Sequence, residues 1–187
     1  MNTEMPQPIK ALLKKLLPYW IARRVASARR SVRFSGMSTK DTFEKVYAEG
    51  FWGRDAEGKP ISGTGSHDAT VVAPYVAVIS QFLSKIGRPT VVDLGCGDFN
   101  IGRQLSSLCE GYLACDISET ILEINRHRYV LENVRFQQLD IATDNLPDAD
   151  VCMVRQVLQH LSNAEISRFV EKLNQDKPYR YLVVTEH

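Results

Sequence analysis

The stretch Thr90-Val-Val-Asp-Leu-Gly-Cys-Gly-Asp-Phe-Asn-Ile-Gly102 predicts how this chain folds. Its first five residues form a short, mostly apolar run rich in β-branched residues, as expected of a parallel strand that is covered on both faces. Glycines follow at positions 95 and 97, where a side chain would block backbone conformations or the close approach of a ligand. We expect a helix from about Asn100, so that the turn presents bare N–H groups and the positive end of a helix to a ligand.

Two classes of ligand are compatible with such a turn. A dinucleotide site requires G-x-G-x-x-G, but here Gly102 comes five residues after Gly97, which breaks that spacing. An acid, Asp93, also stands two residues before Gly95. A carboxylate would repel a pyrophosphate, whereas it would attract the amino group and the sulfonium of S-adenosylmethionine.

The pattern Asp93-Leu-Gly-Cys-Gly97 resembles the first motif of class I S-adenosylmethionine-dependent methyltransferases of the small-molecule type. The resemblance covers about residues 43–187 and is sharpest between Thr90 and His160. It implies an α/β fold of the Rossmann-like, doubly wound kind, with a mostly parallel sheet, helices on both faces and a preceding N-terminal helical segment. It also implies that Asp93 faces the methionine end of the cofactor, while Gly95 and Gly97 allow its close approach.

Length and composition indicate one globular domain with a substantial core. The chain has 187 residues, 44% of them hydrophobic and 24% charged. No apolar run is long enough to span a bilayer. The four cysteines form no C-x-x-C pair and no zinc-ligand spacing, so we expect no metal and a reducing, cytoplasmic environment.

The charge is unevenly distributed, and the first 33 residues hold eight Lys/Arg and one acid. Apolar residues at helical spacing, interrupted by these basic ones, predict a basic amphipathic arm over residues 1–38. Such an arm can contact a membrane surface, pack on the domain or remain a mobile tail. We expect no nucleic-acid partner. We expect a cytoplasmic protein, and the arm makes peripheral association with a membrane an alternative.

Residues 39–86 are predicted to form a helical cover. We expect helices over Thr39–Glu49 and from about Asp68 to Lys85, the second kinked or starting late because of Pro74. Between them, an aromatic-Trp-Gly segment and a Ser-Gly-x-Gly-Ser loop resemble the N-terminal cover of some small-molecule methyltransferases. There the cover folds over the cofactor.

Two predicted contacts come from this cover. The loop at Ser62, Gly63 and Ser66 is small and donor-rich, so it can bind the carboxylate of an amino-acid moiety. The resemblance makes Trp52 a wall of the substrate pocket. An ordinary linker for the loop and core packing for Trp52 are the alternatives.

Residues 87–187 are predicted to form the cofactor-binding α/β core. The strand at Gly111–Cys115 ends in Asp116, 19 residues beyond Gly97, near the offset of roughly 20 residues at which a ribose hydroxyl pair is bound. We therefore place Asp116 and its neighbour Ile117 among the cofactor contacts. The same spacing fits NAD.

The third predicted strand, Val134–Gln138, leads to Asp140 and Ile141. Ligands of open α/β sheets bind at the carboxyl ends of the strands. Asp140 can therefore accept the exocyclic amine of adenine, while Ile141 packs on the ring. A helix cap or a turn acid is the alternative role for Asp140.

A fourth strand, Val151–Val154, leads into Arg155-Gln-Val-Leu-Gln-His-Leu-Ser162. The resemblance implies that Arg155 and Gln156 line the cofactor pocket. His160 is the candidate general base of this region, since a histidine has an ordinary pKa near 6.5. A structural role is the alternative.

The sequence ends after a fifth strand, Tyr179–Thr185, whereas class I methyltransferases usually have two further strands. We expect a fragment, a natural truncation or a sheet edge completed by a partner, which includes an oligomer formed through the bare fifth strand. The leading hypothesis is methyl transfer from S-adenosylmethionine to O or N of a small-molecule acceptor, such as a saccharide or a lipid-linked intermediate. A non-catalytic binding protein with this fold and an NAD-dependent oxidoreductase are the alternatives.

Overall fold

The computed structural model describes residues 34–176 and 179–186. The chain divides into two units, Met1–Ser38 and Thr39–His187, and every helix and strand of the described residues belongs to the second. The basic arm predicted over residues 1–38 lies almost entirely outside the described residues. No helix in the described part of the chain is long and apolar enough to cross a membrane.

A five-stranded parallel sheet forms the centre of the second unit. Its strands follow the order β3-β2-β1-β4-β5, and every neighbouring pair is parallel. The strands are β1 (Thr90–Leu94), β2 (Gly111–Asp116), β3 (Val134–Gln138), β4 (Ala149–Arg155) and β5 (Tyr179–Thr185). The order reverses between β1 and β4, which marks the point where ligands of doubly wound sheets bind.

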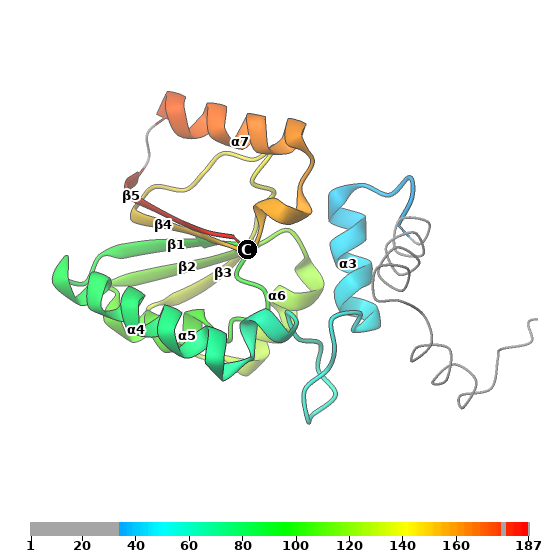
Figure 1. The fold of residues 1–187 in the computed structure, drawn as a ribbon, viewed down its shortest axis with the longest axis horizontal. Coiled ribbons are helices and arrows are strands. Elements are labelled where there is room, and N and C mark those ends of the chain that lie inside the picture. The colour runs from blue at the N-terminus through cyan, green and yellow to red at the C-terminus, as the bar shows by residue number, and fades with distance from the viewer. Residues whose placement is uncertain (1–33, 177–178, 187) are drawn as a thin grey trace, which may run out of the picture. The chain divides into compact units, whose positions relative to one another are not determined.

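Helices cover both faces of this sheet (Figure 1). They are α3 (Thr39–Glu49), α4 (Ala69–Lys85), α5 (Gly102–Leu105), α6 (Glu119–Arg128) and α7 (Asn163–Asp176), with short 3-10 turns η1 (Thr64–Ser66), η2 (Ser106–Leu108) and η3 (Leu158–His160). Helices α4 and α5 lie on one side of the sheet and α7 lies on the other. The predicted Rossmann-like α/β fold is confirmed.

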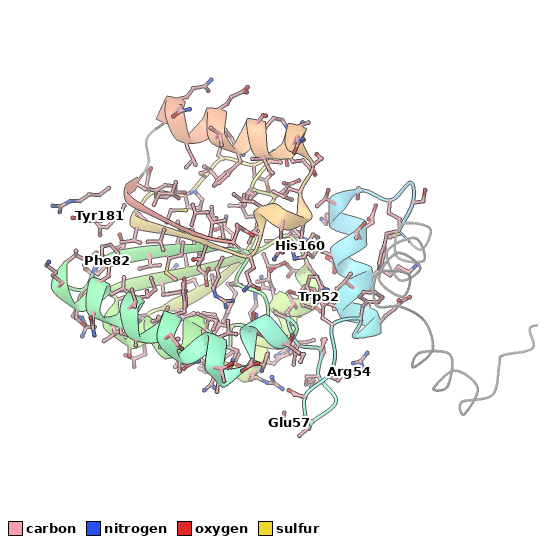
Figure 2. The ribbon with its side chains drawn as sticks, in the orientation of Figure 1. Trp52, Arg54, Glu57, Phe82, His160 and Tyr181 are labelled. Carbon is pink, nitrogen blue, oxygen red and sulfur yellow. The ribbon has the colours of Figure 1, made fainter. Side chains whose placement is uncertain are left out.

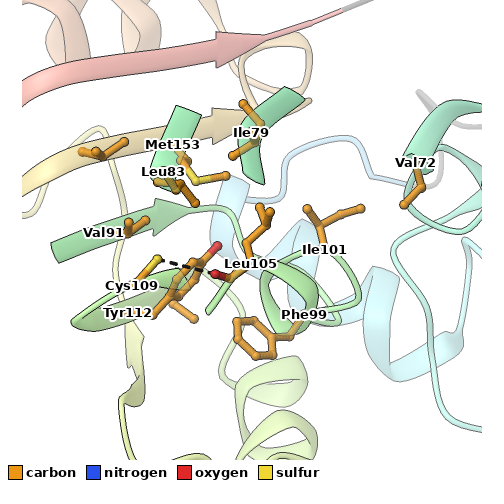
Figure 3. Packing of buried hydrophobic residues seen from close by; sticks show 12 residues of the cluster. Val72, Ile79, Leu83, Val91, Phe99, Ile101, Leu105, Cys109, Tyr112 and Met153 are labelled. Carbon is orange, nitrogen blue, oxygen red and sulfur yellow. Dashed lines mark hydrogen bonds between the residues drawn. The ribbon is translucent and has the colours of Figure 1, made fainter. Parts of the chain in front are cut away.

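Alternating strand residues build a core on each face of the sheet. Val91 of β1 packs with α4 residues such as Leu83 and with Tyr112 of β2 (Figure 3). Its neighbour Val92 packs on the opposite face, in the cluster that contains Phe169 of α7. All five side chains are at most 2% exposed, as expected of strands covered twice.

Helix α4 belongs to the sheet's own helical layer. Its residue Phe82 packs edge-on against Tyr181 of β5, with ring centroids 5.3 Å apart (Figure 2). The helix begins at Ala69, capped by the Asp68 side chain, and it includes Pro74. Of the two expectations for this helix, a kink or a later start, the later start does not occur.

The helix expected from about Asn100 begins later, at Gly102. Phe99 has a positive φ of 61°, and the Asp98 carboxylate accepts the backbone N–H of Asn100. The glycine turn thus continues to Phe99, and only α5 followed by η2 remains helical.

The start of α6 is capped across the chain, not locally. Ser118 is its N-cap residue but makes no side-chain cap bond. Instead, the Glu44 carboxylate of α3 accepts from the Ser118 hydroxyl and from the N–H groups of Glu119 and Thr120. The Glu44 carboxylate therefore fixes α3 beside the start of α6.

Candidate active site

A cavity of about 270 Å³ lies at the carboxyl ends of the strands, between the sheet and the cover. The predicted site residues all line it, from the first glycine turn to the segment after β4. They are Trp52, Ser62, Gly63, Ser66, Asp93, Gly95, Gly97, Asp116, Ile117, Asp140, Ile141, Arg155, Gln156 and His160. The structure therefore brings together residues that are up to 108 positions apart in the sequence.

The glycine turn forms the floor of the cavity. Gly95 and Gly97 have positive φ values of 85° and 55°, which L side chains rarely adopt. A Cβ on Gly95 would lie 2.3 Å from Cγ2 of Val157, and one on Gly97 would lie 2.1 Å from Oγ of Ser62. Both glycines are therefore required because other parts of the chain approach the turn closely.

Asp93 and Asp116 lie at neighbouring points of this floor. The Tyr112 hydroxyl donates to Oδ2 of Asp93 at 2.8 Å. Asp116 accepts the N–H of Gly97 through Oδ2 and that of Ser118 through Oδ1, both at 3.0 Å. The Asp116 carboxylate thus fixes the turn and also faces the cavity, with lone pairs remaining on each oxygen.

Burial raises the pKa of both acids to about 6. For Asp93, the Tyr112 hydroxyl lowers the pKa, the charge of Asp116 raises it and Arg155 lowers it. For Asp116, the backbone donors at Ser118 and Gly97 oppose the effect of burial on its pKa. The charged forms of these two acids are therefore less favoured than those of exposed acids, and a nearby cation or a further donor would stabilise them.

Asp140 stands in the turn that follows β3. Its Oδ1 accepts the N–H of Ala142 at 2.8 Å, and its own N–H donates to Asp144. It is therefore a turn acid, the alternative role named for it, and it lines the cavity beside Ile141 as well.

The cover is fastened to the glycine turn through Ser62. The Ser62 N–H donates to Oδ2 of Asp98 at 2.9 Å, and the Asp98 N–H donates to the Ser62 hydroxyl at 2.8 Å. His67 also hydrogen-bonds to Asp98, and the Tyr47 hydroxyl lies 3.3 Å from Oγ of Ser62. Since Asp98 occupies the Ser62 N–H, only the hydroxyl of Ser62 remains for a ligand.

Arg155 and Gln156 join the segment after β4 to the same cover. Arg155 donates to the carbonyl of Gly65 at 2.8 Å, and its guanidinium lies 5.0 Å from the centre of the Tyr75 ring. Gln156 has a positive φ of 55°, and a Cβ on Gly65 would lie 2.7 Å from its Oε1. Both side chains therefore contact the loop at Gly65 and the cavity.

Aromatic side chains form the outer wall. The rings of Trp52 and His160 lie 5.4 Å apart and tilted by 38°, close together beside α3 (Figure 2). Phe43 meets both edge-on, with centroids 5.7 Å away, and Tyr47 meets Trp52. His160 is exposed, so it stands at the mouth of the cavity rather than in the core.

Sequence patterns do not reveal several residues that build the site. Asp98 anchors the cover and Glu44 caps α6, but both act on partners at least 31 positions away. Helical periodicity places Tyr47 on one face with Phe43 and gives it no site role, yet it is 3% exposed and packs against Trp52. The only local signal for Asp98 is its position directly after the motif.

Comparison with known proteins detects a methyltransferase domain in part of the chain. A family model described as a methyltransferase domain matches residues 91–175. No curated protein sequence matches the chain.

Solved structures share the fold. Phosphoethanolamine N-methyltransferase 1 of Haemonchus contortus, in complex with phosphoethanolamine and S-adenosylhomocysteine, matches with a TM-score of 0.57 at 20% identity, over 78% of this chain and 30% of that one. Magnesium protoporphyrin IX methyltransferase of Synechocystis PCC 6803, with bound S-adenosylmethionine, gives 0.55 at 17% identity, over 74% and 72%. The methyltransferase domain of bacterial CtHen1-C gives 0.52 at 20% identity, over 59% and 63%.

These similarities show that the fold is shared. The chain is shorter than some of the solved proteins that it matches. The chain spans 63%, 46% and 64% of three of the solved chains that it matches. The family model covers β1 to α7, the part of the fold that carries Asp93, Asp116 and Asp140. Residues 91–175 therefore match a methyltransferase domain, and the matched part contains most of the parallel sheet and the Asp93-Leu-Gly-Cys-Gly97 motif.

Proposed function

We propose that this protein transfers a methyl group from S-adenosylmethionine to an oxygen or nitrogen of a small molecule. One observation carries the proposal: Asp93, Asp116 and Asp140, at or just beyond the carboxyl ends of β1, β2 and β3, line a single cavity over the glycine turn. In open α/β sheets ligands bind at this edge.

The chemistry of the lining fits this cofactor. Asp93 is buried and its pKa is raised, so a sulfonium and an ammonium nearby would stabilise its charged form. Asp116 keeps lone pairs for a ribose hydroxyl pair, and Asp140 with Ile141 suits an adenine amine and ring. Ser62, Gly63 and Ser66 of the cover, with Arg155 and Gln156, complete the proposed set of contacts.

When bound, S-adenosylmethionine supplies a methyl group on a positively charged sulfur, ready for attack by a lone pair. The chain's own contribution is to hold the two reactants in line and to exclude water. The aromatic wall of Trp52 and Phe43 suits the acceptor, because it borders the cavity beside the exposed mouth. A hydroxyl acceptor must lose a proton, and His160 is the proposed group to receive it.

The acceptor is inferred from the basic arm alone. A saccharide or a lipid-linked intermediate is our proposal, because the basic arm of residues 1–38 suits a membrane surface. Sedimentation with anionic liposomes, comparing the whole chain with one lacking those residues, tests the membrane part. Equal partitioning of the two proteins would remove it.

Association through β5 is a further part of the proposal. In the described sheet, β5 is an edge strand, and its Leu182 and Val184 are 46% and 45% exposed. Such an edge can pair with another chain. Light scattering over a range of concentrations tests this, and a monomer at every concentration would contradict it.

The enzyme assignment is tested by ligand preference. S-adenosylmethionine and S-adenosylhomocysteine should each raise the melting temperature, whereas NAD should not. Stabilisation by NAD alone would favour an oxidoreductase. Binding of S-adenosylmethionine without methyl transfer to hydroxyl or amine acceptors would favour a non-catalytic binding protein.

A further inference from the structure

The end of β5 holds the loop that closes the cavity over the glycine turn. The carbonyl of Thr185 accepts the N–H of Gln156 at 2.7 Å. One oxygen of Glu186, Oε1, then accepts the N–H groups of both Val157 and Leu158, each at 2.9 Å. The backbone N–H groups of Gln156, Val157 and Leu158 are therefore all bound by two residues. These are Thr185, the last residue of β5, and Glu186, which follows it.

These amides need such partners. Val157 is the N-cap residue of η3, and no side chain of its own turn caps that helix. Gln156 has a positive φ of 55°, a conformation that strains the backbone of any residue other than glycine. A carboxylate bonded to the next two N–H groups offsets that strain, so the loop depends on Glu186 for its shape.

The loop carries the cavity wall. Val157 packs against Gly95, close enough that a Cβ there would lie 2.3 Å from Val157 Cγ2. Three residues further on, the ring of His160 lies 5.4 Å from that of Trp52, tilted by 38°. Displacement of the Val157 and Leu158 amides would therefore move both the surface over the glycine turn and the aromatic wall.

We propose that Glu186 is a positioning residue of the methyltransferase site, acting through the Val157 and Leu158 amides to hold the wall of the cavity. It does not line the cavity itself, so it acts through other groups. Its second oxygen, Oε2, is buried and has no hydrogen-bond partner among the described residues. The inference rests on the proposed function in one respect: S-adenosylhomocysteine is the ligand whose binding is measured.

Because one oxygen of Glu186 accepts both N–H groups, two substitutions at this position should have different effects. In Glu186→Gln the amide oxygen can replace Oε1 and accept both N–H groups, whereas Glu186→Ala leaves both without an acceptor. The matched control is Asp150→Ala. Asp150 accepts the Thr90 N–H and hydroxyl, both at 2.8 Å, at the opposite ends of β1 and β4 from the cavity.

The experiment measures three quantities in the 187-residue chain and these variants. They are the dissociation constant of S-adenosylhomocysteine by calorimetry, amide hydrogen exchange of residues 156–161, and Trp52 emission in a Trp20→Phe background. We expect Glu186→Ala to weaken binding about tenfold, to speed exchange in that segment and to shift Trp52 emission. Glu186→Gln should stay within about threefold of wild type, because it keeps the acceptor oxygen.

Two results would overturn the proposal. One is a loss of affinity in Asp150→Ala as large as in Glu186→Ala, which would indicate a general effect of stability. The other is a Glu186→Ala protein with wild-type affinity, exchange and Trp52 emission. If wild type fails to bind S-adenosylhomocysteine, the proposed function fails, while exchange and emission still decide whether Glu186 holds the loop.

Discussion

Ser62 and Asp98 are joined by two reciprocal hydrogen bonds, 2.9 Å from the Ser62 N–H to the Asp98 carboxylate and 2.8 Å from the Asp98 N–H to the Ser62 hydroxyl. Ser62 belongs to the cover, and Asp98 directly follows the glycine turn. The pair therefore fastens the roof of the cavity to its floor, and Asp98 is only 3% exposed at this junction.

Asp98→Ala should loosen the cover. It leaves the N–H groups of Ser62 and Asn100 without their acceptor, at a cost of about 2 kcal/mol in the free energy of unfolding. Urea unfolding measures this, and calorimetry should show weaker binding of S-adenosylhomocysteine. Asp98→Asn keeps an oxygen for the Ser62 N–H but puts an NH2 group where Asn100 needs an acceptor, so its loss of stability should be intermediate. Equal stability of Asp98→Ala and wild type would contradict the role of this carboxylate.

Gly97→Ala should disturb the same junction from the other side. The new Cβ would meet Ser62 Oγ at 2.1 Å, and the positive φ of 55° adds strain of order 1–3 kcal/mol. We expect lower stability and at least a tenfold loss of cofactor affinity, since 1.4 kcal/mol corresponds to about a factor of ten. Gly111→Ala is the control, because nothing lies within 4 Å of a Cβ there. Similar affinities for both variants would refute this account of the turn.

Glu44→Ala should free the start of α6. It removes the acceptor of the Glu119 and Thr120 N–H groups, and loss of a helix cap typically costs about 1 kcal/mol. Thermal unfolding measures the change, with Glu123→Ala, at an exposed position of α6, as the control. A melting temperature that is unchanged in Glu44→Ala would show that α3 does not cap α6 in solution.

Binding should depend on pH through Asp93. Burial raises its pKa from 3.8 to about 6, so the folded apo protein binds this proton more tightly than the unfolded chain does. The resulting contribution to stability is complete below pH 3.8 and is lost as the pH rises through about 6. A cationic cofactor prefers the charged acid, so its affinity should rise from about pH 5 to pH 7.

The sulfonium allows a controlled measurement of that effect. The affinity of S-adenosylmethionine relative to S-adenosylhomocysteine, which lacks the charge on sulfur, should increase over the same pH range. Asp93→Asn should flatten the ratio, although Asp116, which titrates nearby with a pKa of about 6, still affects both ligands. A ratio that is independent of pH in wild type would place the sulfonium away from Asp93.

Sequence patterns predict those elements that local residues determine. The strand at Thr90–Leu94 and the helix at Thr39–Glu49 have their expected bounds, because apolar periodicity and a glycine stop operate within a few residues. The cavity residues could be named because parallel strands place their carboxyl ends together, so acids following three strands had to meet.

The rest depends on contacts that sequence spacing does not reveal. Helix α5 is short because Phe99 turns with a positive φ, although its sequence pattern continues the helix. Glu44 and Glu186 accept backbone N–H groups 75 and 28 or more positions away, and any exposed carboxylate would have looked the same in sequence. The roles assigned to Asp93, Asp116, Asp140 and His160 in binding and transfer stay predictions.

Titration calorimetry of the wild-type chain and Asp116→Ala with S-adenosylmethionine tests the central claim most directly. The account predicts one site per chain in wild type and at least a tenfold loss of affinity in the variant, because Asp116 fixes the Gly97 N–H and is the proposed acceptor of the ribose hydroxyls. Absence of binding by wild type, or equal affinity of the two proteins, would contradict it.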